Sequence, residues 1–415
     1  MSIFRFWIFH RLPPEKCRKH NSVCDGRRMG RYMYKQYGFR RFLKDYDFKL
    51  ICLVVSLTVL GILAIGSARQ SVQNRQIMGM ALGIFVMLAS SLVDYHFILK
   101  FYHLIYIGNL ILLALVIVMG DDAGGAQRWL EIGGIRFQPS ELAKILLILF
   151  FAQYIMLNRE RLNSFGIILL SLVLIGMPMV MVLKEDLSTT IMIGVIFCVM
   201  MYIGGISHKL VLGLLAVTVP VSVIFLTLVI QPDQKILQDY QQKRILAWLY
   251  PDEYKDTQAY QQNNSMMAIG SGQLLGKGYN NNEISSVKNG NFISEAQTDF
   301  IFAVVGEEWG FLGSCLIVIL EFLIALECAL IGWKARDMAG HVIAGGVAGL
   351  VCFQSFINMG VATGLVPNTG LPLPFVSYGL TSLVSLYLGI GLALNVRWVS
   401  RRARNDGSGN SLSFD

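Results

Sequence analysis

Residues 294–313 read SEAQTDFIFAVVGEEWGFLG and place a carboxylate, Asp299, where a polar stretch turns into an apolar run that continues to residue 333. That run is long enough to cross a bilayer, which takes about 20 residues. A carboxylate at a membrane boundary is costly to desolvate, so Asp299 is a functional candidate. The structural alternative is a helix N-cap with Thr298 beside it, and on the residues alone the two readings are evenly matched.

The composition indicates an integral membrane protein. The 415 residues are 54% hydrophobic and 15% charged, with a mean hydropathy of +0.54, whereas soluble domains carry about 25% charge. Ten apolar runs are present, at 49–68, 75–93, 99–119, 140–157, 163–183, 187–204, 208–230, 300–333, 339–366 and 375–397. None alternates with period two, so the predicted fold class is all-α, a polytopic membrane protein with about ten transmembrane helices. The run 300–333 is long for one crossing and predicts a tilted or extended helix.

Arginine and lysine gather before the first run and in every second gap after it. The positive-inside bias then puts both termini in the cytoplasm and a large extracytoplasmic loop, 231–298, between helices seven and eight. The predicted organisation is a basic cytoplasmic tail over 1–48, one membrane domain over 49–397 and a C-terminal tail over 398–415. The net charge of +8 is explained by topology and contact with anionic lipids, not by nucleic-acid binding.

The first outward segment, 120–144, contains two cations and a carboxylate of interest. Pro139-Ser140-Glu141 is typical of a helix start, and Glu141 and Lys144 share one face of that helix. One reading is a helix-end salt bridge with a capping carboxylate. The other is that Lys144 and Arg128 bind an anionic lipid headgroup, since the arginine fork suits phosphate.

Other polar positions carry weaker signals. Asp186, in a short outward turn, is expected first of all to cap the next helix. The glycine-rich run 268–279, AIGSGQLLGKGY, lacks Walker spacing and Rossmann context, so a phosphate-binding reading is weak. The amide- and aromatic-rich loop around it suits sugars. Loops of this length without their own fold are functional or disordered.

Within the apolar runs, Glu321 and Glu327 interrupt the eighth. A mid-membrane charge costs about 2.5–3.5 kcal/mol, so Glu321 is expected to be protonated, paired or facing a polar cavity, and Glu327 to reach water. The ninth run ends among breakers, namely Asn358, Gly364, Pro367, Gly370, Pro372 and Pro374. This density predicts an interrupted or re-entrant segment lined by protein or water.

Several of these motifs occur together in a known order. They are GGAQRWLEIGGIRFQPSELAK (124–144), the YQQ…AIGSGQLLGKGY loop, EAQTDFIFAVVGEEWGFLG (295–313) and TGLVPNTGLPLPFVSYG (363–379). The chain thereby resembles the SEDS family (shape, elongation, division, sporulation), which includes RodA, FtsW and SpoVE, over nearly all of 47–397. The KDYDFKL entry and the short C-terminal tail are RodA-like.

The resemblance implies a peptidoglycan glycosyltransferase that polymerises lipid II into glycan strands at the outer face of the bacterial cytoplasmic membrane. Asp299 matches the essential aspartate, implied to be the general base for an inverting attack on the donor anomeric carbon. Arg128 and Lys144 match positions tied to activity and are assigned to the diphosphates, and Glu141 matches the acid of the same motif. Arg244 and Lys277 are further substrate-binding candidates, with Asp186, Glu295 and Glu307 as secondary candidates.

The same resemblance implies a divalent cation, Mg²⁺ or Mn²⁺, although the sequence contains no ligand cluster that identifies its site. The implied partners are lipid II, the nascent glycan strand, membrane lipids and a class B penicillin-binding protein, a transpeptidase. Two other functions are considered, a lipid II flippase and a non-catalytic scaffold for the transpeptidase. The chain departs from the family pattern at 184–190, where KEDLSTT replaces QPDLGTA, at 379–382, and at Gln297, where a histidine is common.

Overall fold

The computed structural model describes residues 46–123, 126–132, 135–183, 186–231, 239–257, 259–280, 292–293 and 296–405. The chain divides into two compact units, Met1–Tyr46 and Asp47–Asp415, and all the elements below belong to the second. The tail predicted over 1–48 lies almost entirely outside the described residues.

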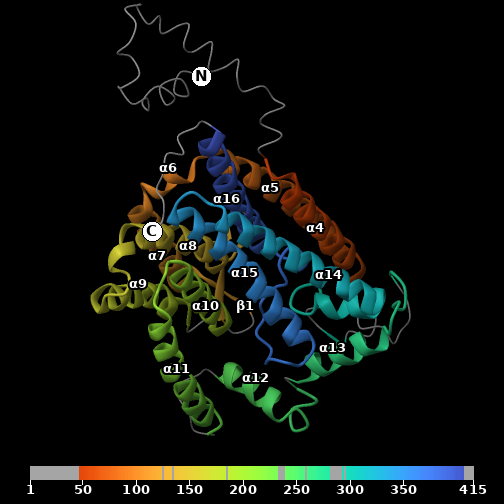
Figure 1. The fold of residues 1–415 in the computed structure, drawn as a ribbon. Helices are drawn as coiled ribbons and strands as arrows, with labels where there is room; N and C mark the ends of the chain where they lie inside the picture. Colours follow the sequence, from red (N-terminus) through yellow and green to blue (C-terminus); the bar gives the residue numbers. More distant parts are fainter. Residues whose placement is uncertain are drawn as a thin grey trace, which may run out of the picture. The chain divides into compact units, whose positions relative to one another are not determined.

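The second unit is built from helices (Figure 1). The longer ones are α4 (Phe48–Ala68), α5 (Gln70–Leu92), α7 (Tyr102–Met119), α8 (Pro139–Leu157), α9 (Phe165–Leu183), α10 (Leu187–Ile203), α11 (His208–Val229), α14 (Ile301–Trp333), α15 (Met338–Ala362) and α16 (Leu380–Asn405). The shorter ones are α6 (Tyr95–Leu99), η2 (Arg159–Arg161), α12 (Asp239–Leu249) and α13 (Tyr260–Ser271). Among the described residues, 8 helices are long and apolar enough to cross a membrane, and α10 is apolar but shorter. Each predicted run coincides with a helix, while the number of crossings stays a prediction.

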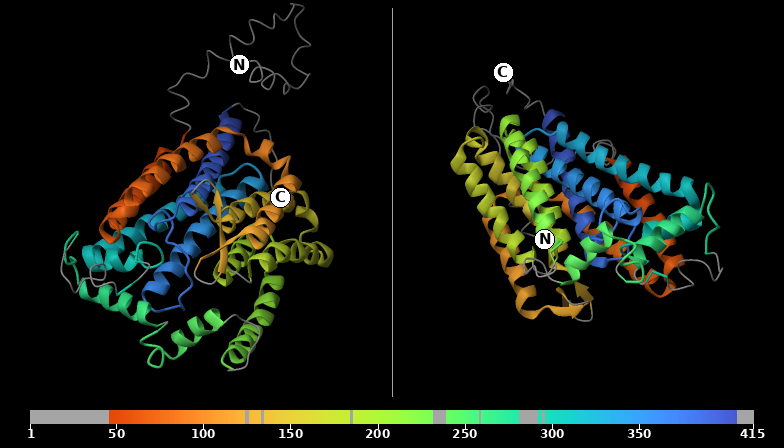
Figure 2. Two further views of the ribbon diagram at one scale, coloured as in Figure 1. Left: turned by 180° about the vertical axis from the view of Figure 1, so that it is seen from behind. Right: turned by 90° about the horizontal axis from the view of Figure 1, so that it is seen from below.

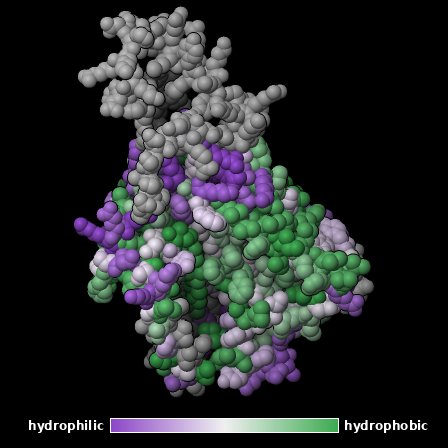
Figure 3. Space-filling view, viewed as in Figure 1, coloured by the Kyte–Doolittle hydropathy of each residue, from purple (hydrophilic) through white to green (hydrophobic). Residues whose placement is uncertain are grey.

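Helix α15 is the centre of the unit, because it packs against α14, α10, α8 and α16. Figures 1 and 2 show it enclosed by these neighbours, with α16 lying along α5. The most apolar window of α15 is 72% buried, whereas those of α7 and α9 are 22% buried. Helices α7 and α9 therefore lie at the periphery of the unit, with fewer buried residues than α15. Figure 3 shows a broad apolar area over α4 and α14, bordered by polar residues at the two ends.

The ninth and eighth apolar runs are each interrupted, the ninth where α15 ends and the eighth inside α14. Helix α15 ends at Ala362 and α16 begins at Leu380, so the residues between them, 363–379, form a non-helical segment. The predicted interruption of the ninth run is therefore present. Helix α14 is not one straight rod, because Gly310 has φ 64° and ψ −160° and breaks it. This break, rather than tilt alone, accommodates the long eighth run.

The mostly helical fold confirms the predicted fold class, and a small antiparallel sheet, of order β1-β2-β3, is added to it. Its strands are β1 (Asp121–Ala123), β2 (Ala126–Ile132) and β3 (Ile135–Phe137), with Leu130 opposite Phe137. The glycine pairs at 124–125 and 133–134 separate the strands, and such pairs are hairpin signals. Strands β1 and β3 have three residues each, and the seven residues of β2 do not alternate regularly between apolar and polar side chains, so no period-two pattern marked the sheet in the sequence.

The predicted extracytoplasmic loop has structure of its own, since it includes α12 and α13. Helix α13 packs against α14 and α15. It is fixed by Gln262, whose Nε2 donates to the carbonyls of Val361 and Val366 at 2.8 Å each. The loop therefore covers the end of the bundle at which α15 gives way to segment 363–379.

The opposite end, predicted to be cytoplasmic, contains two polar clusters. In the first, the Arg397 cluster, Arg397 Nη1 lies 2.6 Å from Asp47 Oδ2 and 2.9 Å from Glu327 Oε1. Lys49 Nζ reaches the other oxygen of Glu327 at 3.0 Å. Burial raises the pKa of Asp47 above its usual value, and the charge of Arg397 opposes this shift only in part. Glu327, predicted to reach water, is instead neutralised by cations within this cluster.

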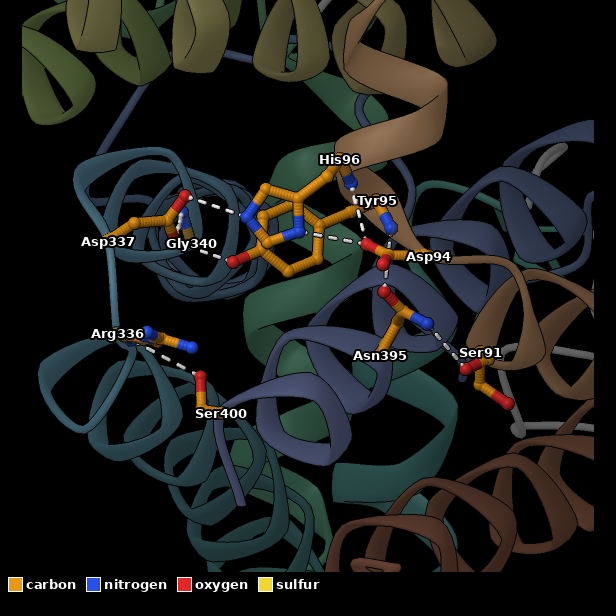
Figure 4. Close-up of polar contacts among 9 residues, drawn as sticks. All are labelled: Ser91, Asp94, Tyr95, His96, Arg336, Asp337, Gly340, Asn395 and Ser400. Atoms are coloured by element: carbon orange, nitrogen blue, oxygen red, sulfur yellow. Dashed lines mark hydrogen bonds and ion pairs between the residues drawn. The ribbon is translucent and has the colours of Figure 1, made fainter. Parts of the chain in front are cut away.

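The second, the His96 cluster, joins α6, α15 and α16 (Figure 4). His96 lies between two carboxylates, with Nδ1 2.8 Å from Asp94 Oδ1 and Nε2 3.2 Å from Asp337 Oδ2. Tyr95 donates its hydroxyl to Asp337 at 2.5 Å, and its backbone N–H to Asn395 at 2.9 Å. Hydrogen bonds to Asp337 and Asp94 raise the pKa of His96 to about 9. The imidazolium therefore persists at neutral pH.

Candidate active site

Asp299 lies immediately before α14, at the end of the bundle that the sequence predicts to face outward. The N-cap of α14 is Phe300, whose side chain makes no capping hydrogen bond. Asp299 therefore lies one residue before the N-cap position that the alternative reading assigned to it. The residue is half-buried, between the buried Gln297 and Phe300, so its carboxylate borders both protein and the exterior.

The carboxylate of Asp299 shares a neighbour with Arg244 of α12. A Cβ built on Gly370 would lie 3.4 Å from Asp299 Oδ2 and 3.6 Å from Arg244 Nη1. Gly370 has φ +74°, a conformation that favours glycine. Three separate parts of the chain, α12, the start of α14 and segment 363–379, thus bring an acid and a cation together. Such a pair can take up a proton and hold an anion at the same place.

Segment 363–379 is irregular backbone at the end of a helix bundle, and side chains from several elements satisfy its carbonyls. Each of the following donates to one carbonyl: Trp248 to Gly364 at 3.2 Å, Ser188 to Thr369 at 2.5 Å, Asn358 to Leu371 at 2.7 Å, Gln354 to Pro372 at 2.9 Å and Gln76 to Ser377 at 3.1 Å. Because these donors come from α5, α10, α12 and α15, the segment is fixed in relation to most of the bundle.

Lys144 and Glu141 form the salt bridge that one reading of the sequence expected. Lys144 Nζ lies 2.8 Å from Glu141 Oε1 and also donates to Gln354 Oε1 at 2.8 Å. The lysine side chain is 1% exposed. Its ammonium carries three hydrogens, of which these contacts use two. Lys144 is thereby connected, through Gln354, to the backbone of segment 363–379.

The remaining candidates are dispersed. Arg128 lies in β2, where Trp129 pairs with Asp121, but its side chain is outside the described part of the structure. Glu295 is likewise outside the described residues. Asp186 caps α10 by accepting from the backbone N–H of Thr189 at 2.9 Å, which is the structural role expected first.

Lys277 and Glu307 belong to a contact between the glycine-rich run and α14. Lys277 Nζ lies 2.9 Å from Glu307 Oε1, and Ser67 donates to Glu308. A Cβ on Gly276 would lie 2.1 Å from the carbonyl oxygen of Glu308, and one on Gly272 2.0 Å from that of Gly306. Two of the glycines are thus explained by close backbone packing beside the break at Gly310, which needs no phosphate.

Sequence analysis did not single out Gln354, Ser377 or Gln76, and it treated Asn358 only as a breaker. A signal existed, because Gln354 and Asn358 are spaced four apart in an otherwise apolar run. That spacing puts two amides on one helix face. Within the described residues, no three His, Cys, Asp or Glu side chains gather into a group that could hold a metal ion.

Comparison with known proteins gives concordant results. A family model described as "cell cycle protein" (FtsW, RodA, SpoVE) matches residues 45–402. The probable peptidoglycan glycosyltransferase FtsW of Geobacter metallireducens is 32% identical over 369 residues, 85% of this chain and 95% of that protein. The peptidoglycan glycosyltransferase MrdB of Escherichia coli K12 is 33% identical over 361 residues, covering 84% and 93% respectively.

Solved structures agree with these relatives. A chain in a structure titled "Structural coordination of polymerization and crosslinking by a peptidoglycan synthase complex" matches with a TM-score of 0.71 and 27% identity, covering 86% of this chain and 98% of that one. The crystal structure of the rod shape determining protein RodA of Thermus thermophilus matches with a TM-score of 0.63 and 26% identity, covering 86% and 97%.

Proposed function

The chain belongs to the FtsW/RodA/SpoVE family, a family of multi-pass membrane proteins also called SEDS, and on that premise we propose that it is a peptidoglycan glycosyltransferase that polymerises lipid II. Its curated relatives are named for this activity, and the chain spans nearly their whole length. The observation that carries the proposal is the carboxylate of Asp299 beside the guanidinium of Arg244, at one end of a helix bundle.

In this proposal Asp299 is the general base. It removes the proton from the 4-hydroxyl of the acceptor GlcNAc, and that oxygen attacks the anomeric carbon of the donor MurNAc. The C–O bond to undecaprenyl diphosphate breaks, and the configuration at the anomeric carbon inverts. A positioned base contributes about 10²–10⁴-fold. Its place at a helix boundary lets the base meet a sugar in water while the polyprenyl chain stays in lipid.

The leaving diphosphate needs cations, and we assign Arg244 to it first. Arg244 is half-buried and borders the same glycine as the base, and its fork suits a phosphate. Arg128, Lys144 and Lys277 are further proposed contacts. For Lys144 a direct contact uses the third ammonium hydrogen, because Glu141 and Gln354 occupy the other two. For Lys277, a contact with the diphosphate would compete with its ion pair to Glu307.

A divalent cation is proposed only as a partner of the substrate. The described residues contain no group of three candidate ligands, so they do not form an all-protein cage. Mg²⁺ at phosphate sites typically uses one or two carboxylates together with substrate oxygens, and Asp299 is the carboxylate that fits this description. No step of the reaction above passes through the metal.

The proposed setting is the bacterial cytoplasmic membrane, with the Asp299 end facing outward. The charge distribution supports this orientation, since basic residues gather at the opposite end. We also propose a class B penicillin-binding protein as partner. The support is the likeness to a chain from a complex whose title joins polymerisation with crosslinking.

Three functions are separated by one experiment. Purified protein with its cognate transpeptidase is incubated with lipid II, and in parallel reconstituted into liposomes loaded with labelled lipid II. Polymer that disappears in Asp299→Asn supports the glycosyltransferase. Lipid II scrambling that is insensitive to Asp299→Asn, without polymer, supports a flippase. Neither activity, with intact partner binding, leaves the scaffold. Two observations favour the flippase as the second candidate: the ninth apolar run is interrupted after α15, and Glu321 is buried in the membrane part of α14.

A further inference from the structure

Two amide side chains of α15, Asn358 and Gln354, enter the same short stretch of segment 363–379. Asn358 Nδ2 donates to the carbonyl of Leu371 at 2.7 Å and also to the carbonyl of Asp299 at 2.9 Å. Gln354 Nε2 donates to the next carbonyl, that of Pro372, at 2.9 Å. One donor group thus ties the main chain of the proposed base to the main chain beside Gly370.

The chemistry of the site fixes the orientation of Asn358. Both of its Nδ2 partners are carbonyl oxygens, which only accept, so turning the amide round would point oxygen at oxygen. Asn358 is 1% exposed and Gln354 0% exposed, so water does not substitute for these bonds. Loss of the donor would leave buried carbonyls unsatisfied.

Three successive backbone carbonyls just before α14 each accept a hydrogen bond. The carbonyl of Gln297 accepts from the N–H of Tyr378 at 2.9 Å, and that of Thr298 accepts from Ser377 Oγ at 2.6 Å. The third carbonyl, that of Asp299, is the one held by Asn358. Three successive residues are therefore attached to segment 363–379 or to α15.

We propose that Asn358 and Gln354 are positioning residues for Asp299. They hold the Leu371–Pro372 backbone against the main chain of Asp299, and so keep the carboxylate at Gly370 and Arg244. Gln354 also accepts from Lys144, so the buried lysine is connected to the base through this amide. The inference rests on the proposed function for its kinetic consequence, but its structural part stands independently.

The test compares Asn358→Leu with Asn395→Leu, because the two asparagines are matched. Asn395 is 0% exposed and also makes two hydrogen bonds, to Tyr95 N and Ser91 O, at the opposite end of the bundle. Both variants are expected to lose stability. Only Asn358→Leu is expected to lower kcat for lipid II polymerisation, by about 10- to 100-fold with KM little changed, because a base displaced by about 1 Å loses that much. Asn358→Ser, which keeps one donor, is expected to fall between wild type and Asn358→Leu.

A second readout does not need activity. The amide of Leu373 is bonded to Ser377 Oγ and the amide of Tyr378 to the carbonyl of Gln297. Hydrogen exchange at these two amides is expected to be at least about 10-fold faster in Asn358→Leu than in Asn395→Leu. If Asn358→Leu does not fold, Gln354→Met is compared with Asn395→Leu in the same way.

The outcomes are distinct. Equal kcat in the two asparagine variants, or unchanged exchange at Leu373 and Tyr378, would overturn the positioning role. If wild type itself makes no polymer, the proposed function fails, and the exchange comparison alone decides whether Asn358 holds the segment.

Discussion

Asp299 and Arg244 meet at Gly370: a Cβ on this glycine would lie 3.4 Å from Oδ2 of the aspartate and 3.6 Å from Nη1 of the arginine. Arg244 comes from α12, Asp299 lies just before α14, and Gly370 belongs to segment 363–379. A methyl group at position 370 would therefore make van der Waals contact with both the proposed base and the cation proposed to bind the diphosphate.

Gly370→Ala tests this relationship. Its expected effects are a loss of about 1 kcal/mol of stability, since alanine is strained at φ +74°, and a further drop in polymerisation rate. Gly205→Ala is the matched control, because Gly205 has φ +94° and no atom within 4 Å of its Cβ position. Thermal unfolding and lipid II polymerisation are measured for both. Equal polymerisation rates would mean that the space beside Gly370 does not matter for the reaction.

The glycine-rich run offers a second matched pair. Gly276→Ala is expected to destabilise the protein by more than Gly278→Ala, because a Cβ at 276 would lie 2.1 Å from the carbonyl oxygen of Glu308 while one at 278 meets nothing within 4 Å. Both glycines have positive φ, so the difference in Tm isolates the packing of this run on α14. Similar Tm values in the two variants would reopen the phosphate-binding reading.

The Arg397 cluster allows the loss of a largely buried cation, Arg397, to be compared with the loss of an exposed one, Lys49. Arg397→Met leaves Asp47 and Glu327 facing each other with side chains 4% and 7% exposed, and removal of one partner from a buried network costs about 3–5 kcal/mol. Lys49→Met removes a side chain that is 67% exposed, and such pairs contribute about 0–1 kcal/mol. Chemical denaturation should therefore rank Arg397→Met far below Lys49→Met. Comparable losses would contradict the burial assigned to the cluster.

The His96 cluster predicts loss of stability in mildly alkaline solution. Hydrogen bonds to Asp337 and Asp94 raise the folded-state pKa of His96 from 6.5 to about 9. Its contribution is therefore complete below pH 6.5 and is lost as the pH rises to about 9. Burial alone would raise the pKa of Asp337, but the bonds from His96 and Tyr95 lower it below 3.8, so its contribution is lost only as the pH falls through the acid range.

The measurement is Tm in detergent at pH 6 and pH 9 for wild type and His96→Asn. Wild type is expected to lose a few degrees more than the variant, since the partly exposed imidazole is screened by solvent. A variant that loses as much as wild type would show that another group titrates in this window.

Sequence alone predicted well the positions of the ten long helices that the structure describes, because membrane spans are marked by long apolar runs with basic flanks. It did not predict the short helices α6, α12 and α13, which lack such runs. It also located the interruption after Ala362 from its prolines and glycines. It missed the sheet β1–β3, because the sequence of β2, AQRWLEI, does not alternate regularly between apolar and polar residues. It also missed the break at Gly310, since one glycine in an apolar run has no local signal of its own.

The candidate site was predictable only in part. The resemblance supplied Asp299 and Arg244, but their meeting at Gly370 depends on contacts between segments distant in sequence, which no local pattern encodes. The hydrogen bonds of the Asn358 amide were not predictable for the same reason. The sequence marked Asn358 only as a helix breaker, so neither its burial nor the two carbonyls that it holds could be predicted.

The most direct test of the central claim is lipid II polymerisation by purified Asp299→Asn and Glu321→Gln proteins, each with the transpeptidase. Glu321 is a buried carboxylate of the same helix region, 2% exposed, that is given no catalytic role. Asp299→Asn should lower the initial rate by about 100-fold or more, while Glu321→Gln should stay within a few-fold of wild type. Polymerisation by Asp299→Asn at a rate near that of wild type would contradict the account.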